Sequence, residues 1–246
     1  MSLPVHLVPS LAGVRAGSVV EVTGDEAHHA VAVRRLRVGE SVVLTDGLGT
    51  SVTGEVVSTG KRLFAVSATS VDSAPRATPA VTVVQAIPKG ERGELAVEVL
   101  TEIGVDEIVP WAASRCVSVW RGERAAKSHA KWESTAREAA KQARRSWFPV
   151  VPPLASTADV VSLLASADLA VVLHEKGEVA LAALPVPGSG RIVVVVGPEG
   201  GISPEELAAF AAAGVRSARL GAEVLRTSTA GVAAVSALLA RTSRWA

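Results

Sequence analysis

The chain has 246 residues, 48% of them hydrophobic and 20% charged, with a formal net charge of +1 and a single cysteine, Cys116. This length allows one large or two small domains with well-buried cores, and the longest apolar runs are far too short to cross a bilayer. Because one cysteine excludes an intramolecular disulfide and no secretory leader is recognisable, we expect a cytoplasmic protein without a membrane segment.

The N-terminal residues 1–72 contain short β-rich runs and one helical stretch. The helix is expected from Asp25 to about Leu36, and turn signals separate the runs, which cover residues 19–22, 41–44, 52–57 and 64–68. Several short strands broken by turns are typical of a small β-barrel. Residues 73–80 contain two prolines and are predicted to form an extended linker.

Strands and helices alternate in residues 81–246. We expect strands near residues 81–87, 106–111, 169–173, 191–196 and 216–220. Helices are expected near residues 91–103, 128–145, 157–166, 203–213 and 229–241. Such alternation is typical of an α/β domain with a parallel sheet that is covered on both faces.

The valine run 193–196 leads into a glycine loop, Gly197-Pro198-Glu199-Gly200-Gly201, and then into a helix. Ser203 and Glu206 have capping-box spacing, and Pro204 fits the first helical position. Glycines allow a ligand to approach the backbone closely, and the only charge, on Glu199, favours a neutral or cationic ligand over a phosphate. An ordinary tight turn is an equally good interpretation of the loop alone.

Two further segments follow expected strands. Leu173-His174-Glu175 ends one strand, and residues 220–231 lie between another strand and an apolar helix containing Val232, Val235, Leu238 and Leu239. Ends of parallel strands are where open α/β sheets bind ligands. For the segment at His174, a plain surface loop remains an equal alternative.

Positive charge is concentrated in two places. Residues 115–145 hold nine basic and three acidic side chains, and a smaller cluster is Arg34, Arg35 and Arg37. Such clusters are expected of a protein that binds phosphate backbones, although a solvated helix face is the commoner outcome for one charge run. Four tryptophans in or beside the basic stretch are candidates for base stacking, but core packing is expected for at least half of them.

Several motifs in order resemble one known family, the RsmE-type 16S rRNA (uracil-N3)-methyltransferases of the SPOUT superfamily. The motifs are D-G-L-G at 46–49, T-E-I-G-V at 101–105, E-A-A-K-Q-A-R-R at 138–145, G-P-E-G-G at 197–201 and L-R-T-S-T-A at 225–230. The resemblance implies a PUA-like RNA-binding barrel (1–72), a linker (73–80) and a SPOUT domain (81–246) whose chain forms a trefoil knot. It also implies a homodimer.

The resemblance further implies an S-adenosylmethionine-dependent enzyme that methylates N3 of a uridine in the decoding region of the small ribosomal subunit. The implied cofactor residues are Leu173, His174, Glu175, Gly197, Pro198, Glu199, Gly200, Gly201, Ile202, Leu220, Gly221, Leu225, Arg226, Thr227, Ser228 and Ala230. Arg226 and Arg145 are the expected catalytic residues. The expected RNA contacts are Arg34, Arg35, Arg37, Arg115, Arg144 and Arg145.

One residue departs from the family pattern, because Ser228 stands where the family usually has a glutamate. Two alternatives therefore remain: a non-catalytic RNA-binding or ribosome-assembly protein on the same scaffold, and a nucleotide-using enzyme unrelated to methyl transfer. The missing phosphate-loop motifs speak against the second. We expect no metal site, since the five histidines show no i, i+4 pair and no C-x-x-C is present.

Overall fold

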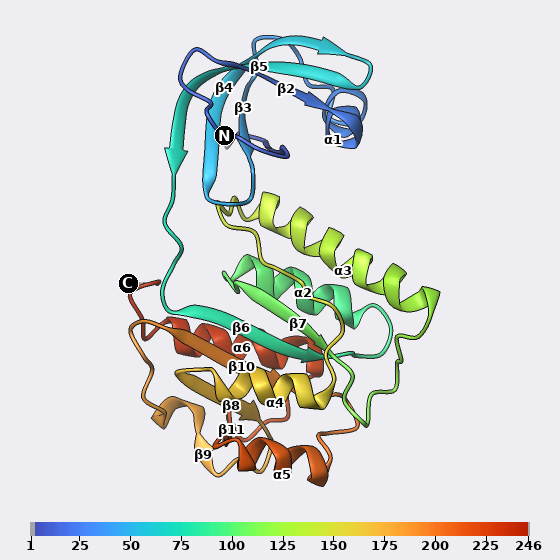
Figure 1. The fold of residues 1–246 in the computed structure, drawn as a ribbon, viewed down its shortest axis with the longest axis vertical. Helices are drawn as coiled ribbons and strands as arrows, with labels where there is room; N and C mark the ends of the chain where they lie inside the picture. The colour runs from blue at the N-terminus through green and yellow to red at the C-terminus, as the bar shows by residue number, and fades with distance from the viewer. Residues whose placement is uncertain (1–2, 246) are drawn as a thin grey trace. The chain divides into compact units, whose positions relative to one another are not determined.

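The computed structural model describes residues 3–245 (Figure 1). The chain forms two compact units. The first is Met1–Arg76 together with Ala140–Phe148, and the second is Ala77–Ala139 together with Pro149–Ala246. The segment 140–148, which the sequence places in the C-terminal domain, therefore lies in the first unit.

The first unit is built on a five-stranded sheet. Its strand order is β1-β3-β4-β5-β2, antiparallel except for the β1–β3 pair. The strands are β1 (Val5–Leu7), β2 (Val19–Thr23), β3 (Ser41–Thr45), β4 (Thr50–Gly60) and β5 (Leu63–Ser73). The four predicted strands are confirmed, whereas β1 was too short to be recognised. Within residues 3–245 no ladder joins β1 to β2, so closure into a barrel stays a prediction.

The predicted helix 25–36 is shorter and less regular than expected. An α-helix, α1 (Gly24–His28), runs into a π-helical turn, η1 (His29–Val33). Arg35 then adopts a left-handed backbone with φ of 57°, and the Leu36 N–H donates to the Ala30 carbonyl at 3.0 Å. This backbone geometry ends the helix three residues before the predicted end.

A half-buried carboxylate, that of Glu26, fixes α1 to residues 140–148, the returning segment. Glu26 accepts hydrogen bonds from Lys141 Nζ at 3.0 Å and faces His6 Nδ1 at 3.2 Å. Burial raises the pKa of Glu26, but the hydrogen bonds from His6 and Lys141 outweigh burial and hold that pKa below its ordinary value. The carboxylate is therefore ionised, and it anchors Lys141 and the residues after it within the first unit.

A second contact of the returning segment, between Trp147 and Gly49, requires a glycine at position 49. Gly49 has φ of 102°, and a Cβ there would lie 2.5 Å from the indole ring of Trp147. The Gly49 N–H donates to the Ser146 carbonyl at 2.9 Å, and Trp147 Nε1 donates to the Ala74 carbonyl at 2.8 Å. The indole of Trp147 thus packs against the D-G-L-G turn at Gly49.

The second unit has a six-stranded, wholly parallel sheet in the order β7-β6-β10-β8-β11-β9. Its strands are β6 (Ala80–Ala86), β7 (Glu107–Trp111), β8 (Leu169–Leu173), β9 (Val179–Ala180), β10 (Arg191–Val196) and β11 (Arg216–Arg219). The predicted parallel sheet is confirmed, and only the two-residue β9 was missed.

Helices cover both faces of this sheet, as predicted. The core that contains Val194 and Val196 includes residues of α2 (Arg92–Glu102), α3 (Glu123–Gln142) and α6 (Thr227–Leu239). The core with Val193 and Val195 includes residues of α4 (Thr157–Ala165) and α5 (Pro204–Ala212). A one-turn 3-10 helix, η2 (Leu181–Ala183), and the first five residues of α3 were not predicted.

The valine run is buried on both faces because successive side chains of β10 enter the two cores alternately. Val235, Leu238 and Leu239 of α6 are also buried, so these apolar side chains pack into the core of the second unit. In the part of the chain that the structure describes, no helix is both long and apolar enough to span a membrane.

Candidate functional site

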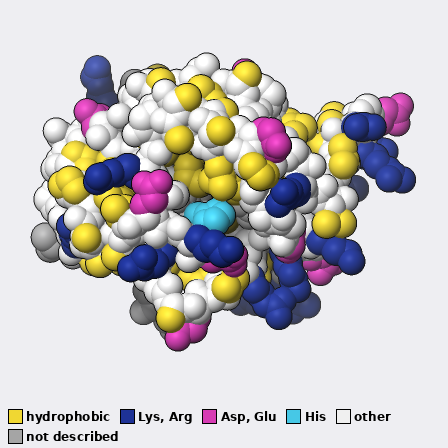
Figure 2. All heavy atoms as spheres, turned by 90° about the horizontal axis from the view of Figure 1, so that it is seen from below, with side chains coloured by type: hydrophobic (Ala, Val, Ile, Leu, Met, Phe, Trp, Pro, Cys, Tyr) yellow, Lys and Arg dark blue, Asp and Glu magenta, His cyan; other side chains and the backbone are white. Residues whose placement is uncertain are grey.

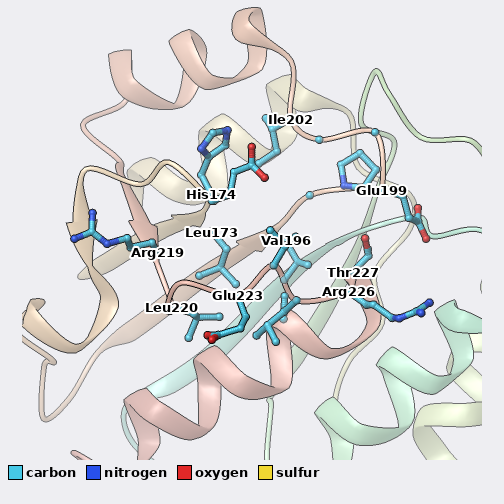
Figure 3. Close-up of a pocket in the computed structure, with 18 of the residues that line it drawn as sticks. Leu173, His174, Val196, Glu199, Ile202, Arg219, Leu220, Glu223, Arg226 and Thr227 are labelled. Atoms are coloured by element: carbon cyan, nitrogen blue, oxygen red, sulfur yellow. The ribbon is translucent and has the colours of Figure 1, made fainter.

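The carboxyl ends of β8, β10 and β11 open into one pocket of about 580 Å³ (Figure 3). Three loops form it, at residues 173–175, 196–202 and 218–227. All predicted cofactor residues line it except Ser228: Leu173, His174, Glu175, Gly197, Pro198, Glu199, Gly200, Gly201, Ile202, Leu220, Gly221, Leu225, Arg226, Thr227 and Ala230. Its volume is within the usual range for small-molecule sites.

The glycine loop is folded so tightly that side chains do not fit at two positions. A Cβ at Gly200 would lie 2.8 Å from the carbonyl oxygen of Arg115, and one at Gly197 would lie 2.7 Å from Cγ1 of Ile202. Gly201 has φ of 73°, which favours glycine for a different reason. The loop therefore presents backbone to the pocket.

A capping box fixes the direction of the loop. Ser203 Oγ accepts from the Glu206 N–H at 3.2 Å, and Glu206 Oε2 accepts from the Ser203 N–H at 3.0 Å, as predicted. The other carboxylate oxygen, Oε1, accepts from the Ser114 N–H at 2.7 Å. One buried glutamate thus joins α5 to the loop after β7.

The segment at His174 is a tight turn on the neighbouring strand. The His174 N–H donates to the Ala218 carbonyl at 3.0 Å, and its Nδ1 accepts from the Lys176 N–H at 3.1 Å. Gly177 lies so close to the backbone of Ala218 and Arg219 that a Cβ would overlap it. These contacts leave Nε2 as the imidazole nitrogen without a role in the turn.

A buried glutamine supports the third loop from below. Gln85, at the end of β6, donates from Nε2 to the carbonyls of Ala86 at 3.1 Å and Thr227 at 3.3 Å. It is fully buried, and within residues 3–245 its Oε1 has no hydrogen-bond partner. Gln85 therefore ties the start of α6 to the sheet. Nothing in the apolar run around it signalled this position.

The charges around the pocket are mixed. Glu199 Oε1 accepts from the Lys89 N–H at 3.2 Å and lies 3.8 Å from Arg92 Nη1. Figure 3 shows the side chains of Arg219 and Arg226 at opposite ends of the pocket, with Leu173 between them. Figure 2 shows basic and acidic side chains interspersed around apolar side chains on one face. This mixture suits a ligand that carries both charges.

Several lining residues were not predicted. They are Arg92, Val196, Ala218, Arg219, Glu223 and Val224, together with Arg115, which was expected to bind RNA. Positions next to a predicted strand end, such as 196 and 219, follow from the same reasoning as their neighbours. No local pattern identifies Arg92, because it belongs to α2 and lines the pocket only through the tertiary packing of that helix.

Arg115 lies against the glycine loop. Its Nη1 is 3.5 Å from the Gly200 carbonyl oxygen, and its own backbone forms the surface on which Gly200 packs. This position gives Arg115 a role in holding the loop, and an RNA contact by Arg115 stays a prediction.

The remaining predicted RNA-binding residues share one unit. Arg34, Arg35 and Arg37 follow η1, and Arg144 and Arg145 lie in the segment 140–148, so all five belong to the first unit. Six of the nine basic residues in 115–145 lie in the second unit, and only Lys141, Arg144 and Arg145 lie in the first. Arg145 accordingly does not line the pocket of the second unit.

The tryptophans divide as expected between core and surface positions. Trp111 and Trp132 are buried in the second unit, and Trp120 and Trp147 are half-buried. Arg76 stacks over Trp147 at 4.1 Å from the ring centroid. In the described part of the chain, no three His, Cys, Asp or Glu side chains are placed to hold a metal ion.

Comparison with known proteins defines the class. Residues 75–239 match the family model for an RNA methyltransferase domain, and residues 22–68 match that for an RNA methyltransferase PUA domain. The chain is 43% identical to ribosomal RNA small subunit methyltransferase E of Mycobacterium bovis, over 93% of this chain and 89% of that protein. The Bacillus subtilis enzyme of that name is 29% identical, over 88% of each.

The chain belongs to the ribosomal RNA small subunit methyltransferase E family. A crystal structure of this enzyme from Neisseria gonorrhoeae, bound to S-adenosyl methionine, superimposes with a TM-score of 0.88 at 28% identity and covers 98% of both chains. A methyltransferase from Legionella pneumophila in complex with the same cofactor gives 0.89 at 27% identity, over 98% of this chain and 99% of that one.

Proposed function

We propose that the pocket of the second unit binds S-adenosylmethionine and that the protein methylates N3 of a uridine in the decoding region of small-subunit ribosomal RNA. The observation that carries this proposal is the convergence of three loops, one of them walled by glycine backbone, on a single pocket. The cofactor-bound relatives from Neisseria gonorrhoeae and Legionella pneumophila support it.

The lining residues fit this cofactor. Leu173, Val196 and Leu220 supply apolar surface for a flat ring, and the loop around Gly200 supplies backbone donors and acceptors for the ring edge. The carboxylates of Glu175, Glu199 and Glu223 are suited to the ammonium and sulfonium charges, and the arginines to the carboxylate. When bound, S-adenosylmethionine supplies an electrophilic methyl group.

The chemistry at uracil N3 requires removal of an imide proton and stabilisation of the resulting anion. Arg226 lines the pocket, and its guanidinium stays cationic, so it is the group we assign to the anion. Glu199 lines the same pocket and is the candidate for receiving the proton, directly or through water. The neutral His174 ring cannot receive it at Nε2, because Nδ1 accepts the Lys176 N–H and Nε2 therefore carries the ring proton. Ser228 has no part in this scheme.

Methylation of purified small subunits that lack the modification tests the activity. We expect transfer of one methyl group per subunit from S-adenosylmethionine, mapped to N3 of one uridine by nuclease digestion and mass spectrometry. A product methylated on ribose or on another base would contradict the uracil-N3 assignment. The absence of cofactor binding would contradict the function as a whole.

We further propose that the first unit binds RNA phosphates through Arg34, Arg35, Arg37, Arg144 and Arg145. All but Arg145 are exposed, and the PUA family match covers much of the same unit. Each lost phosphate contact should reduce the slope of log K against log salt by about 0.7 to 0.9. Arg34→Ala/Arg35→Ala and Arg144→Ala/Arg145→Ala should each show this reduction when binding to a ribosomal RNA fragment is measured over a salt series.

Lys61→Ala is the matched control, because Lys61 is an exposed cation of the first unit outside the proposed surface. Its slope should equal that of the wild-type protein. Unchanged slopes in both double variants would remove the RNA-binding role assigned to these arginines.

We also propose a homodimer, in which the partner subunit places its own Arg145 beside the pocket. Two exposed apolar residues in the lining of the pocket, Leu225 at 40% and Val224 at 75% exposure, support a partner surface there. Light scattering at micromolar concentration should give twice the chain mass. A strict monomer would exclude a shared site.

Three finer features remain proposals of the same kind: the cytoplasmic location, the closed barrel of residues 1–72 and the trefoil knot of residues 81–246. The knot is proposed from the family resemblance alone. After β10 the chain crosses to one face of the sheet in α5, returns through β11 and reaches the opposite face in α6, as in other α/β domains with helices on both faces. The connection at residues 220–226 runs beside the glycine loop.

A non-catalytic RNA-binding or ribosome-assembly role is the second candidate, and Ser228 is the observation that favours it. The side chain is 4% exposed at the start of α6, where the family usually has a glutamate. A protein that binds ribosomal RNA and S-adenosylmethionine but transfers no methyl group would establish this role.

A further inference from the structure

A second pocket in the second unit has no part in the function described so far. It measures about 290 Å³ and lies where the loop after β6, the first turn of α2, the loop before α3 and α3 itself meet. Its lining residues are Ile87, Pro88, Gly90, Gly93, Glu94, Ser118, Val119, Trp120, Arg124, Lys127, Ser128 and Trp132.

Two tryptophans form its aromatic wall. The rings of Trp120 and Trp132 meet edge to face, with centroids 5.1 Å apart and an interplanar angle of 83°. Trp132 is 2% exposed, and its indole fills the space in which a Cβ at Gly93 would stand. Trp132 therefore fixes the half-buried Trp120, whose remaining surface is available for stacking.

A carboxylate with an unused oxygen forms another wall. Glu94 Oε1 lies 2.8 Å from Lys131 Nζ, whereas within residues 3–245 its Oε2 is buried without a hydrogen bond. The hydrogen bond to Glu94 raises the pKa of Lys131, so the pair is ionic. An ionised carboxylate only accepts hydrogen bonds, and a buried oxygen without a donor is unfavourable. A small rotation of the carboxylate would let it meet a ligand N–H.

Two cations stand at the edge of the pocket. Arg124 and Lys127 are exposed, and neither forms an ion pair with an acidic side chain in the described part of the chain. The hydroxyl groups of Ser118 and Ser128 lie in the same lining. Free cations and hydroxyls beside an aromatic surface are the groups that bind a phosphate next to a base.

We propose that this pocket binds one unstacked nucleotide of the RNA substrate. The base stacks on Trp120, its Watson–Crick-edge N–H donates to Glu94, and the phosphate lies at Arg124 and Lys127. The need for a ring N–H favours uridine or guanosine. This proposal rests on the proposed function in one respect only, that the substrate is RNA.

Two segments, 87–94 and 115–120, contribute residues both to this pocket and to the cofactor pocket. Ile87 and Pro88 line the nucleotide pocket, Lys89 donates its N–H to Glu199, and Arg92 lines the cofactor pocket. A nucleotide bound at Trp120 would therefore lie on the other side of the wall formed by residues 87–94. Its contribution is to hold the RNA in place, so it should act on KM and leave kcat unchanged.

Direct binding is measured by titrating the protein with uridine 5′-monophosphate and following the indole N–H resonances of its five tryptophans, assigned with single Trp→Phe variants. We expect the resonances of Trp120 and Trp132 to shift and that of Trp245 to stay. The 3-methyl nucleotide lacks the N–H and should bind more weakly. Unshifted resonances, or equal binding of both nucleotides, would overturn the proposal.

Variants test the role in the substrate complex. Trp120→Ala should raise KM for RNA by about tenfold, as expected for one lost base stack, with kcat and the Kd for S-adenosylmethionine unchanged, and Trp120→Phe should restore most of the affinity. Lys127→Ala should raise KM, whereas Arg216→Ala, which removes an exposed arginine outside both pockets, should not.

Wild-type KM in Trp120→Ala and Lys127→Ala would overturn the proposal while leaving the methyltransferase function intact. If instead the wild-type protein binds no S-adenosylmethionine, the proposed function fails. The nucleotide titration still decides whether the pocket exists as a site, because it needs neither cofactor nor activity.

Discussion

Gly200→Val should lower the affinity for S-adenosylmethionine by about ten- to a hundredfold and leave the fold intact. The reason is steric, because a Cβ at this position would lie 2.8 Å from the carbonyl oxygen and 3.1 Å from the Cβ of Arg115. Overpacking costs about 1–3 kcal/mol, and here the loop can relax only by moving into the pocket. Isothermal titration calorimetry measures the loss.

The matched control is Gly188→Ala. Gly188 lies in an exposed turn of the same unit, with no atom within 4 Å of the Cβ position and no positive φ. Its affinity for the cofactor should equal that of the wild-type protein. Wild-type affinity in Gly200→Val, with a thermal transition like that of the control, would mean that the glycine loop is not part of the cofactor site.

Gly201 differs from the two other glycines of the loop, and this difference is testable in the same series. Gly201 has open space at its Cβ position but φ of 73°, so Gly201→Ala strains the backbone without blocking it. We therefore expect Gly201→Ala to affect affinity less than Gly200→Val does. Of the three glycines in the loop, only Gly201 has a positive φ.

Local patterns predicted much of the second unit. The run of valines and the capping box at Ser203 and Glu206 depend on neighbours in sequence, and the structure has both. The three ligand loops follow from the same information, since each begins where a predicted strand ends. Such features need no knowledge of distant contacts.

Features that depend on distant contacts were missed. The return of residues 140–148 to the first unit is fixed by the contact of Lys141 with Glu26 and of Trp147 with Gly49, and neither is visible in a local pattern. Tertiary contacts likewise place Gln85 beneath the third loop and Arg92 in the pocket lining. Arg144 and Arg145 lie in the first unit for the same reason, because they belong to residues 140–148.

Two arginines of the first unit have a strained backbone conformation that no sequence pattern predicts. Arg35 and Arg144 both adopt positive φ, at 57° and 53°, immediately after a helical segment. A non-glycine residue pays a conformational cost there, which the surrounding structure must offset. Both arginines belong to the surface that we assign to RNA, so their strained geometry is consistent with positioning for contact.

Arg226→Ala should lower single-turnover methylation by about a hundredfold or more, as the removal of one well-placed donor to a developing anion does. Arg226 lines the pocket at the start of α6, where Thr229 and Ala230 both donate their N–H groups to its carbonyl at 2.9 Å. Its backbone position is therefore fixed. Arg226→Lys keeps the charge but not the planar group, and it should give an intermediate rate.

Ser228→Ala is the matched comparison, since it lies two residues away and is expected to cost far less. Ser228 is buried and does not line the pocket, and a serine hydroxyl is a poor base near neutral pH without an activating partner. If the glutamate usual in this family were the indispensable base, the wild-type chain would be inactive. We expect it to be active, with Arg226 stabilising the uracil anion while the proton leaves to water or to Glu199.

The measurement is methylation of small subunits under single-turnover conditions, with cofactor and RNA affinities determined separately for each variant. A rate loss in Arg226→Ala at unchanged affinities places the effect in the chemical step. Robust activity in Arg226→Ala together with none in Ser228→Ala would reverse the assignment. In that case the buried hydroxyl, rather than the guanidinium, would be the group on which transfer depends.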